Sequence, residues 1–152
     1  MTTASMMLAI ILVTGFGMAR ESATAAVADR VGTIDVSIEG FRNAAGHARV
    51  ALFNGEAGFP DDESAAYRKT VAVIEGGRVE VRFDGVPRGE YAVAMYHDEN
   101  DDGKLNKGLL GIPKEGYGVS NNVSHATRAP RFTEARFQFD GASQTVSIRV
   151  HY

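Results

Sequence analysis

Short segments in which apolar and polar residues alternate occupy this chain from Gly32 to its end, and they constrain its fold more than any other feature. A period of two is typical of β-strands with one face toward a core, because successive side chains point to opposite faces. Clusters of glycine, proline, asparagine and aspartate separate the segments, and a helical period is almost absent. The predicted strands cover residues 33–38, 47–53, 70–74, 78–83, 92–97, 133–139 and 145–150.

This pattern predicts an all-β fold, an antiparallel two-sheet sandwich of about seven strands that is immunoglobulin-like or transthyretin-like. A partly open barrel is the alternative. The strands at 33–38 and 47–53 are expected to pair as a hairpin, and so are the two strands that flank the Gly76-Gly77 turn. The strand at 92–97 is apolar on both faces, which is typical of a strand in the middle of a sheet.

The N-terminal segment 1–28 has the composition of a signal peptide. Residues 6–18 form an uncharged apolar run that is too short to span a bilayer comfortably. Small residues suitable for cleavage follow near positions 25 and 28, although the first residues lack the usual Lys or Arg. An uncleaved anchor or a buried first helix is the alternative. We therefore expect a periplasmic or secreted protein with a single domain at 29–152 and no membrane span after cleavage.

Composition excludes several classes of function. The chain has no cysteine, which rules out disulfides, thiolate metal sites and cysteine nucleophiles. Its 16 basic and 19 acidic residues form no basic stripe, so nucleic acid is not an expected partner. The four histidines form no HxH or HExxH pair, so the sequence does not predict a zinc site. The partner classes that remain are a protein, a peptide or a glycan.

An acidic loop, residues 98–106, carries oxygen-bearing side chains at alternate positions and then a glycine. Calcium prefers six to eight oxygen ligands, and the glycine permits the sharp turn of a calcium loop. Leu109 replaces the bidentate glutamate of an EF-hand, so Glu115, Asn121 or water would complete the coordination. The alternative is a turn whose side chains cap their own backbone without an ion. The predicted calcium ligands are Asp98, Asn100, Asp102, the Lys104 carbonyl and Asn106.

The long segment 104–130 contains no predicted strand. Connections of this length in a compact domain are usually functional or disordered. Several apolar residues in the segment need burial, which favours an ordered loop folded against the sandwich. We interpret the loop at 98–122, which overlaps this segment, as the partner-binding loop. The candidate contact residues in and beside it are His97, Glu115, Tyr117, Ser120 and Asn121.

The run AVAMYHDENDDGKLNKGLLGIPKEGYGVSNN at 92–122 resembles the signature of a family of exported bacterial proteins, domain of unknown function 2141. The shared features are the Tyr-His-Asp start, the Asn/Asp/Gly-rich turn, Lys-Leu, and Gly-x-Pro-x-Glu-Gly-Tyr-Gly-x-Ser-Asn. Asp102 and Asn106 stand where the family often has Asn and Asp. The resemblance covers most of the mature chain and implies a small secreted or periplasmic β-sandwich. It supplies no catalytic residues, because the family has no established activity.

Two classes of function follow from these observations. The first is a noncatalytic exported envelope protein, a binding or structural module whose acidic loop is stabilised by Ca²⁺. The alternative is a periplasmic hydrolase in which His97 acts with Asp98, Glu115 or Ser120. Neighbouring strand residues point to opposite faces, which disfavours direct orientation of His97 by Asp98.

Overall fold

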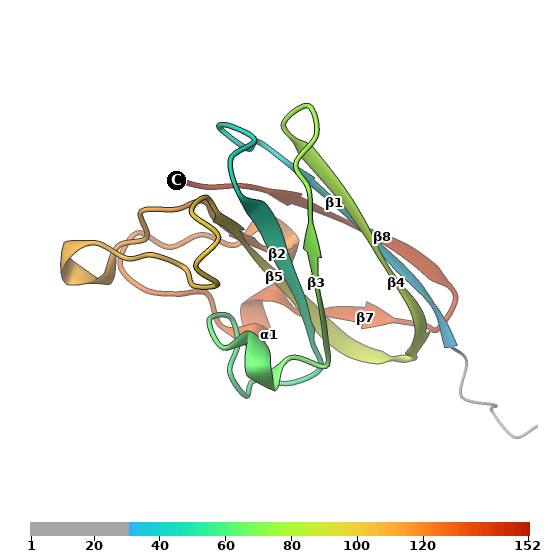
Figure 1. The fold of residues 1–152 in the computed structure, drawn as a ribbon. Helices are drawn as coiled ribbons and strands as arrows, with labels where there is room; N and C mark the ends of the chain where they lie inside the picture. Colours follow the sequence, from blue (N-terminus) through green and yellow to red (C-terminus); the bar gives the residue numbers. More distant parts are fainter. Residues whose placement is uncertain (1–30) are drawn as a thin grey trace, which may run out of the picture.

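The computed structural model describes residues 31–152, which form a sandwich of two β-sheets (Figure 1). The predicted signal peptide at 1–28 lies outside the described residues. The first sheet has three strands in the order β4-β1-β8. These strands are β1 (Val31–Glu39), β4 (Arg78–Pro87) and β8 (Ser143–Arg149).

The second sheet has five strands in the order β3-β2-β5-β6, with β7 paired to β5 as well. These strands are β2 (His47–Phe53), β3 (Arg68–Ala72), β5 (Gly89–Asp98), β6 (Tyr117–Val119) and β7 (Phe137–Phe139). The short helices are η1 (Glu63–Ala65), η2 (Leu109–Gly111), η3 (Ser120–Asn122) and α1 (Phe132–Ala135). The predicted all-β sandwich is thus confirmed, while the immunoglobulin-like or transthyretin-like topology stays a prediction. No helix within 31–152 has the length and apolar character to cross a bilayer.

Strand pairing differs from the sequence-based expectation in three places. β1 and β2 lie in different sheets, and so do β3 and β4, so neither predicted pair of strands forms within one sheet. The predicted Gly76-Gly77 turn does form, because an antiparallel bridge between Glu75 and Arg78 closes it. β1 instead pairs antiparallel with β4 and parallel with β8, which makes one pair of the sandwich parallel. The two predicted pairings were wrong because alternation reveals only which face of a strand is buried. The alternating pattern does not depend on which strand is the partner or on whether the two strands run parallel or antiparallel.

Two further differences concern the region after β5. The predicted strand at 133–139 begins as α1, and only Phe137–Phe139 is a strand. The Glu134 side chain accepts the backbone N–H of Arg131 at 2.8 Å, which stabilises this short helical turn at its N-terminus. β6 lies inside the segment that was expected to contain no strand, and it is only three residues long. Such short strands are difficult to recognise from alternation.

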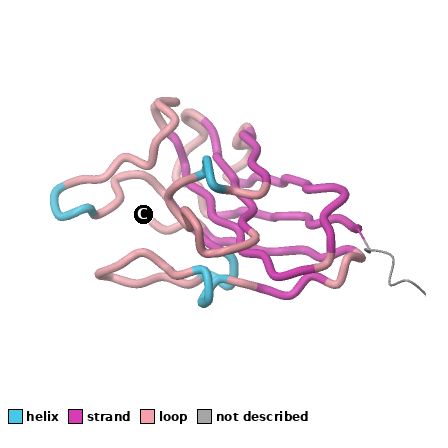
Figure 2. Tube along the Cα trace, turned by 90° about the horizontal axis from the view of Figure 1, so that it is seen from below, coloured by secondary structure: helices cyan, strands magenta, loops and turns pink. Residues whose placement is uncertain are grey.

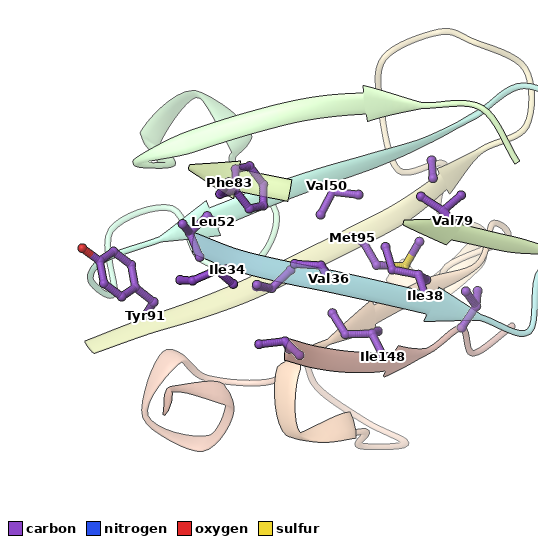
Figure 3. Packing of buried hydrophobic residues seen from close by; sticks show 14 of the residues in the cluster. Ile34, Val36, Ile38, Val50, Leu52, Val79, Phe83, Tyr91, Met95 and Ile148 are labelled. Atoms are coloured by element: carbon purple, nitrogen blue, oxygen red, sulfur yellow. The ribbon is translucent and has the colours of Figure 1, made fainter. Parts of the chain in front are cut away.

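Apolar residues fill the space between the sheets. Ile34, Val36 and Ile38 of β1 are completely buried and pack against β2, β5 and β8 (Figure 3). A second cluster lies on the other side of β5, where Ala92 and Ala94 contact Phe132 of α1 and its neighbours. Both faces of β5 are therefore buried, which confirms its predicted central position. This rigid strand carries the acidic loop at its end.

Candidate functional site

Asp98 is the last residue of β5 and anchors the acidic loop from inside the protein. Its side chain is fully buried. One carboxylate oxygen accepts the N–H of Asp102 at 3.0 Å, and the other accepts the N–H of Gly103 at 2.9 Å. Arg49 donates its Nε–H to the second oxygen at 2.7 Å, and this bond raises the pKa of the guanidinium. These three donors use most of the roughly four acceptor positions of the carboxylate.

The side-chain amide of Asn106 lies at the centre of the acidic loop. Its Nδ2 is 3.0 Å from Asp102 Oδ2, 3.2 Å from Glu115 Oε2, 3.4 Å from Asn100 Oδ1 and 3.5 Å from the Lys104 carbonyl. An amide nitrogen carries two N–H groups, so it cannot satisfy four acceptors. Four oxygen atoms thus converge on the amide nitrogen of Asn106, whose N–H groups carry a partial positive charge.

Glu115 folds back onto this loop, as one of the alternatives from the sequence required. It is 5% exposed. Its Oε1 accepts the N–H of Glu99 at 3.0 Å, and its Oε2 accepts the N–H of Asn106 at 2.8 Å. Asn121 does not reach the loop, because its amide donates to the carbonyls of Glu134 and Arg136, each at 3.1 Å. Glu115 therefore closes the loop at its base.

The converging oxygens come from two carboxylates, one amide and one backbone carbonyl. In the region that the structure describes, no three or more His, Cys, Asp and Glu side chains are grouped so as to hold a metal ion. Asp98 is not part of this set, because its carboxylate accepts N–H groups. The set itself combines charged carboxylate oxygens with neutral amide and carbonyl oxygens. Such a set suits a self-capped turn or a hard cation such as Ca²⁺, which accepts neutral oxygen ligands.

His97 is completely buried and forms hydrogen bonds through both ring nitrogens. Nε2 lies 2.7 Å from the Ala45 carbonyl, which only accepts, so Nε2 carries a proton. Nδ1 lies 2.7 Å from the hydroxyl of Tyr152, and that hydroxyl accepts the N–H of Arg42 at 3.1 Å. In the neutral ring Nδ1 therefore accepts from Tyr152. His97 thus fastens the C-terminal residue to the loop before β2.

Ser120 is also fully buried and joins three segments. Its Oγ accepts the N–H of Val93 at 2.9 Å and donates to the carbonyl of Ala135 at 2.6 Å. Among the described residues, Ser120 and His97 form no hydrogen bond with each other or with the Asp98 and Glu115 carboxylates. The structure therefore does not bring the four residues of the hydrolase hypothesis into contact, and each of them holds part of the fold.

We expect Ser120→Ala to lower the free energy of unfolding by about 1–3 kcal/mol, because the N–H of Val93 would lose its acceptor in the interior. Urea denaturation measures this loss. Ser124→Ala is the matched control, since Ser124 is exposed and its removal should change stability by less than about 0.5 kcal/mol. Equal stability of the two variants would contradict the structural role of Ser120.

Two segments extend from the same end of the sandwich (Figure 2). The residues of these segments line a cleft of about 580 Å³ beside the acidic loop. One segment is the arm, which we define as residues 103–114 and which contains η2. The other segment is the loop at 123–130. Side chains of β5 and β6 form the floor, and the last two residues of the chain lie between the walls. The floor and terminal residues are Ala94, Met95, Tyr96, Tyr117, Gly118, Val119, His151 and Tyr152.

Both apolar and polar side chains line the cleft. His151 lines it, and the buried Nε2 of this residue has no hydrogen-bond partner within residues 31–152. Burial raises the pKa of Tyr96 to about 12, so its hydroxyl stays protonated at neutral pH. Arg128 at the rim donates to Glu134 at 2.6 Å and holds the pKa of that carboxyl well below its usual value. Such a composition is typical of ligand sites.

Sequence reasoning found part of this cleft. Tyr117 was predicted as a contact residue and lines it, together with Tyr96. Phe132 does not line the cleft, because it is only 7% exposed and belongs to the second core cluster. His151 was missed, because it reaches the cleft through a bridge to Tyr117 that no local sequence signal predicts.

Comparisons with known proteins bear on the family of this chain. No curated protein and no solved structure matches the chain. One family model matches residues 36–147, from the middle of β1 to Ser147 within β8. That range includes the acidic loop, the arm and most of both sheets. The chain belongs to the family described as "Uncharacterized protein conserved in bacteria (DUF2141)".

Proposed function

We propose that this protein is an exported, noncatalytic binding module whose cleft holds an extended peptide segment of a partner protein. The observation that supports the proposal is the cleft between the arm and the loop at 123–130. Its volume of about 580 Å³ falls within the range of ligand sites, which is about 300–1,000 Å³. Export to the periplasm or the medium rests on the predicted signal peptide at 1–28.

The chemistry of the cleft favours a peptide over a glycan. Leu105, Leu110 and Ile112 offer apolar surface to side chains, and polar lining residues such as Tyr96 and Thr127 offer hydrogen-bonding groups to backbone amides. An extended peptide presents both kinds of group in alternation. A glycan is covered with hydroxyls, many of which would lose their hydrogen bonds against these apolar walls.

A Ca²⁺ ion at the base of the arm is part of the same proposal. Half a turn of the Asn106 amide would place Oδ1 where Nδ2 lies and would add a fifth oxygen to the four that already converge there. Ca²⁺ could then bind Asn100, Asp102, the Lys104 carbonyl, Asn106 and Glu115, with water completing the coordination. The ion would fix the arm relative to β5 and so hold the cleft open.

Blocking the cleft tests the peptide proposal. Ala126 is exposed and lines the cleft, so Ala126→Trp should fill part of it without disturbing the core. We expect peptides selected from a random display library against the wild-type protein to bind this variant at least about tenfold more weakly. Fluorescence polarisation of the labelled peptides measures the difference.

Ala44→Trp is the matched control, because Ala44 is exposed on the loop between β1 and β2 and does not line the cleft. The control should bind the selected peptides as the wild-type protein does. A library that yields no binding peptide, or peptides that bind the blocked variant equally well, would contradict the proposal.

A further inference from the structure

The tip of the arm exposes three large apolar side chains. Leu109 is 88% exposed, Leu110 is 89% exposed and Ile112 is 60% exposed. The arm projects away from the sheets, in amber at the left of Figure 1. Its two sides are joined by backbone bonds, from Gly108 N–H to the Ile112 carbonyl at 2.7 Å and from Lys114 N–H to the Asn106 carbonyl at 2.8 Å. The tip is therefore an ordered turn with unburied leucines.

The backbone of this turn is unusual for the residues that form it. Leu110 has a φ of 63°, in the left-handed region that a leucine rarely adopts. Gly111 follows with a φ of 74°, and the position of its missing side chain is open on all sides. The turn thus accepts an unfavourable leucine conformation and places the apolar side chains outward. Burial of these side chains in an apolar environment would compensate for the cost of the leucine conformation and of the exposed apolar surface.

Charge is segregated along the arm. Residues 103–114 contain Lys104, Lys107 and Lys114 and no acidic residue, although the whole chain has a net charge of -3. Lys107 donates to Asp61 at 2.6 Å, whereas Lys104 and Lys114 are exposed. The side chain of Lys114 lies against Gly108, directly behind the apolar tip. We call Lys104, Lys107 and Lys114 the lysine collar. An apolar tip with this collar fits an interface that is apolar inside and negatively charged at its surface.

We propose that the arm inserts its tip into the headgroup region of a bilayer that contains anionic lipids. This inference goes beyond the proposed peptide cleft and does not depend on it. The leucines and the isoleucine enter the boundary of the acyl chains, and the lysine collar meets the lipid phosphates. A symmetric contact between two copies is disfavoured, because it would bring the exposed Lys104 and Lys114 of one copy toward those of the other.

A tryptophan at the tip reports insertion directly. The chain has no native tryptophan, so Leu109→Trp in the full-length protein gives a single reporter on the arm. Its emission should shift to the blue with phosphatidylglycerol/phosphatidylcholine vesicles, and lipids brominated on the acyl chain should quench it. The reporter is local, so the apolar run at 6–18 cannot produce this signal by bringing the protein to the vesicles.

Val73→Trp is the matched control. Val73 is 64% exposed and directly follows β3, at the edge of the sheet opposite β6. Its emission should not change with the same vesicles. In the Leu109→Trp background, Lys104→Gln with Lys114→Gln should weaken binding by about thirtyfold, and Leu110→Ser by about tenfold.

Three results would overturn the inference. The first is an unchanged emission of Leu109→Trp at saturating anionic lipid. The second is an equal response to vesicles of phosphatidylcholine alone, which would remove the role of the lysine collar. The third is a blue shift that grows with protein concentration without lipid, which would assign the tip to contacts between two copies of the chain.

Discussion

Asp98→Asn is expected to lower the free energy of unfolding by about 3 kcal/mol. The substitution breaks a buried ion pair and puts a hydrogen-bond donor where one carboxylate oxygen now accepts. The carboxylate accepts hydrogen bonds from Arg49, Asp102 and Gly103 at 2.7 to 3.0 Å. An amide in its place would direct N–H groups at one of these donors and would leave the guanidinium of Arg49 without its nearest anion. Glu63 lies 3.4 Å from Arg49 and limits the loss.

Asp101→Asn provides the matched comparison for this variant. Asp101 lies three residues further along the same loop, its side chain is 51% exposed, and it pairs with His47 at 2.6 Å. Its φ is 56°, which asparagine also tolerates. Exposed pairs contribute little, so this substitution should cost less than about 1 kcal/mol. Urea denaturation of the two variants measures the contrast, and equal losses would contradict the assignment of Asp98 as the buried anchor.

The fold could be predicted from sequence wherever burial alone defines it. Alternation of apolar and polar residues identified the bounds of β2 and the inward-facing residues of β1, and the apolar character of both faces placed β5 at the centre. Pairing was not predictable in the same way. The parallel contact of β1 with β8 joins the two ends of the described chain, and nothing in either segment specifies its partner or its direction.

The acidic loop shows the same division. The spacing of Asn100 and Asp102 indicated two of the converging oxygens, whereas Asp98, which was predicted with them, accepts N–H groups instead. The contribution of Glu115 was only one of several alternatives, because it depends on how the whole arm folds back. Side chains expected to act chemically, such as His97 and Ser120, are instead buried and hydrogen bonded on all sides. Residue type alone does not distinguish these two roles.

Asn106→Asp should distinguish a Ca²⁺ site from a self-capped turn. In the presence of chelator, the new carboxylate would lie about where Nδ2 now contacts Asp102 at 3.0 Å and Glu115 at 3.2 Å. Loss of two hydrogen bonds and repulsion among three carboxylates should lower the free energy of unfolding by about 2–3 kcal/mol. Calcium should restore this stability, since the substitution turns the central donor into a charged ligand.

The control for this variant is Asn43→Asp, which adds the same charge in an exposed turn. The side-chain oxygen of Asn43 accepts the N–H of Ala45 at 2.9 Å, and aspartate keeps that bond while it loses the donation of the Asn43 amide to Glu99. The response to calcium, and not the stability without it, is therefore compared. With Ca²⁺ at the base of the arm, millimolar calcium raises the melting temperature of the wild-type protein and raises that of Asn106→Asp further, while the control responds as the wild type does. If calcium shifts none of the three, the Asn106 amide occupies this point in place of an ion and joins Asp98 and Glu115 in holding the loop. The cleft then depends on hydrogen bonds within the chain, and its proposed role in peptide binding stands without the ion.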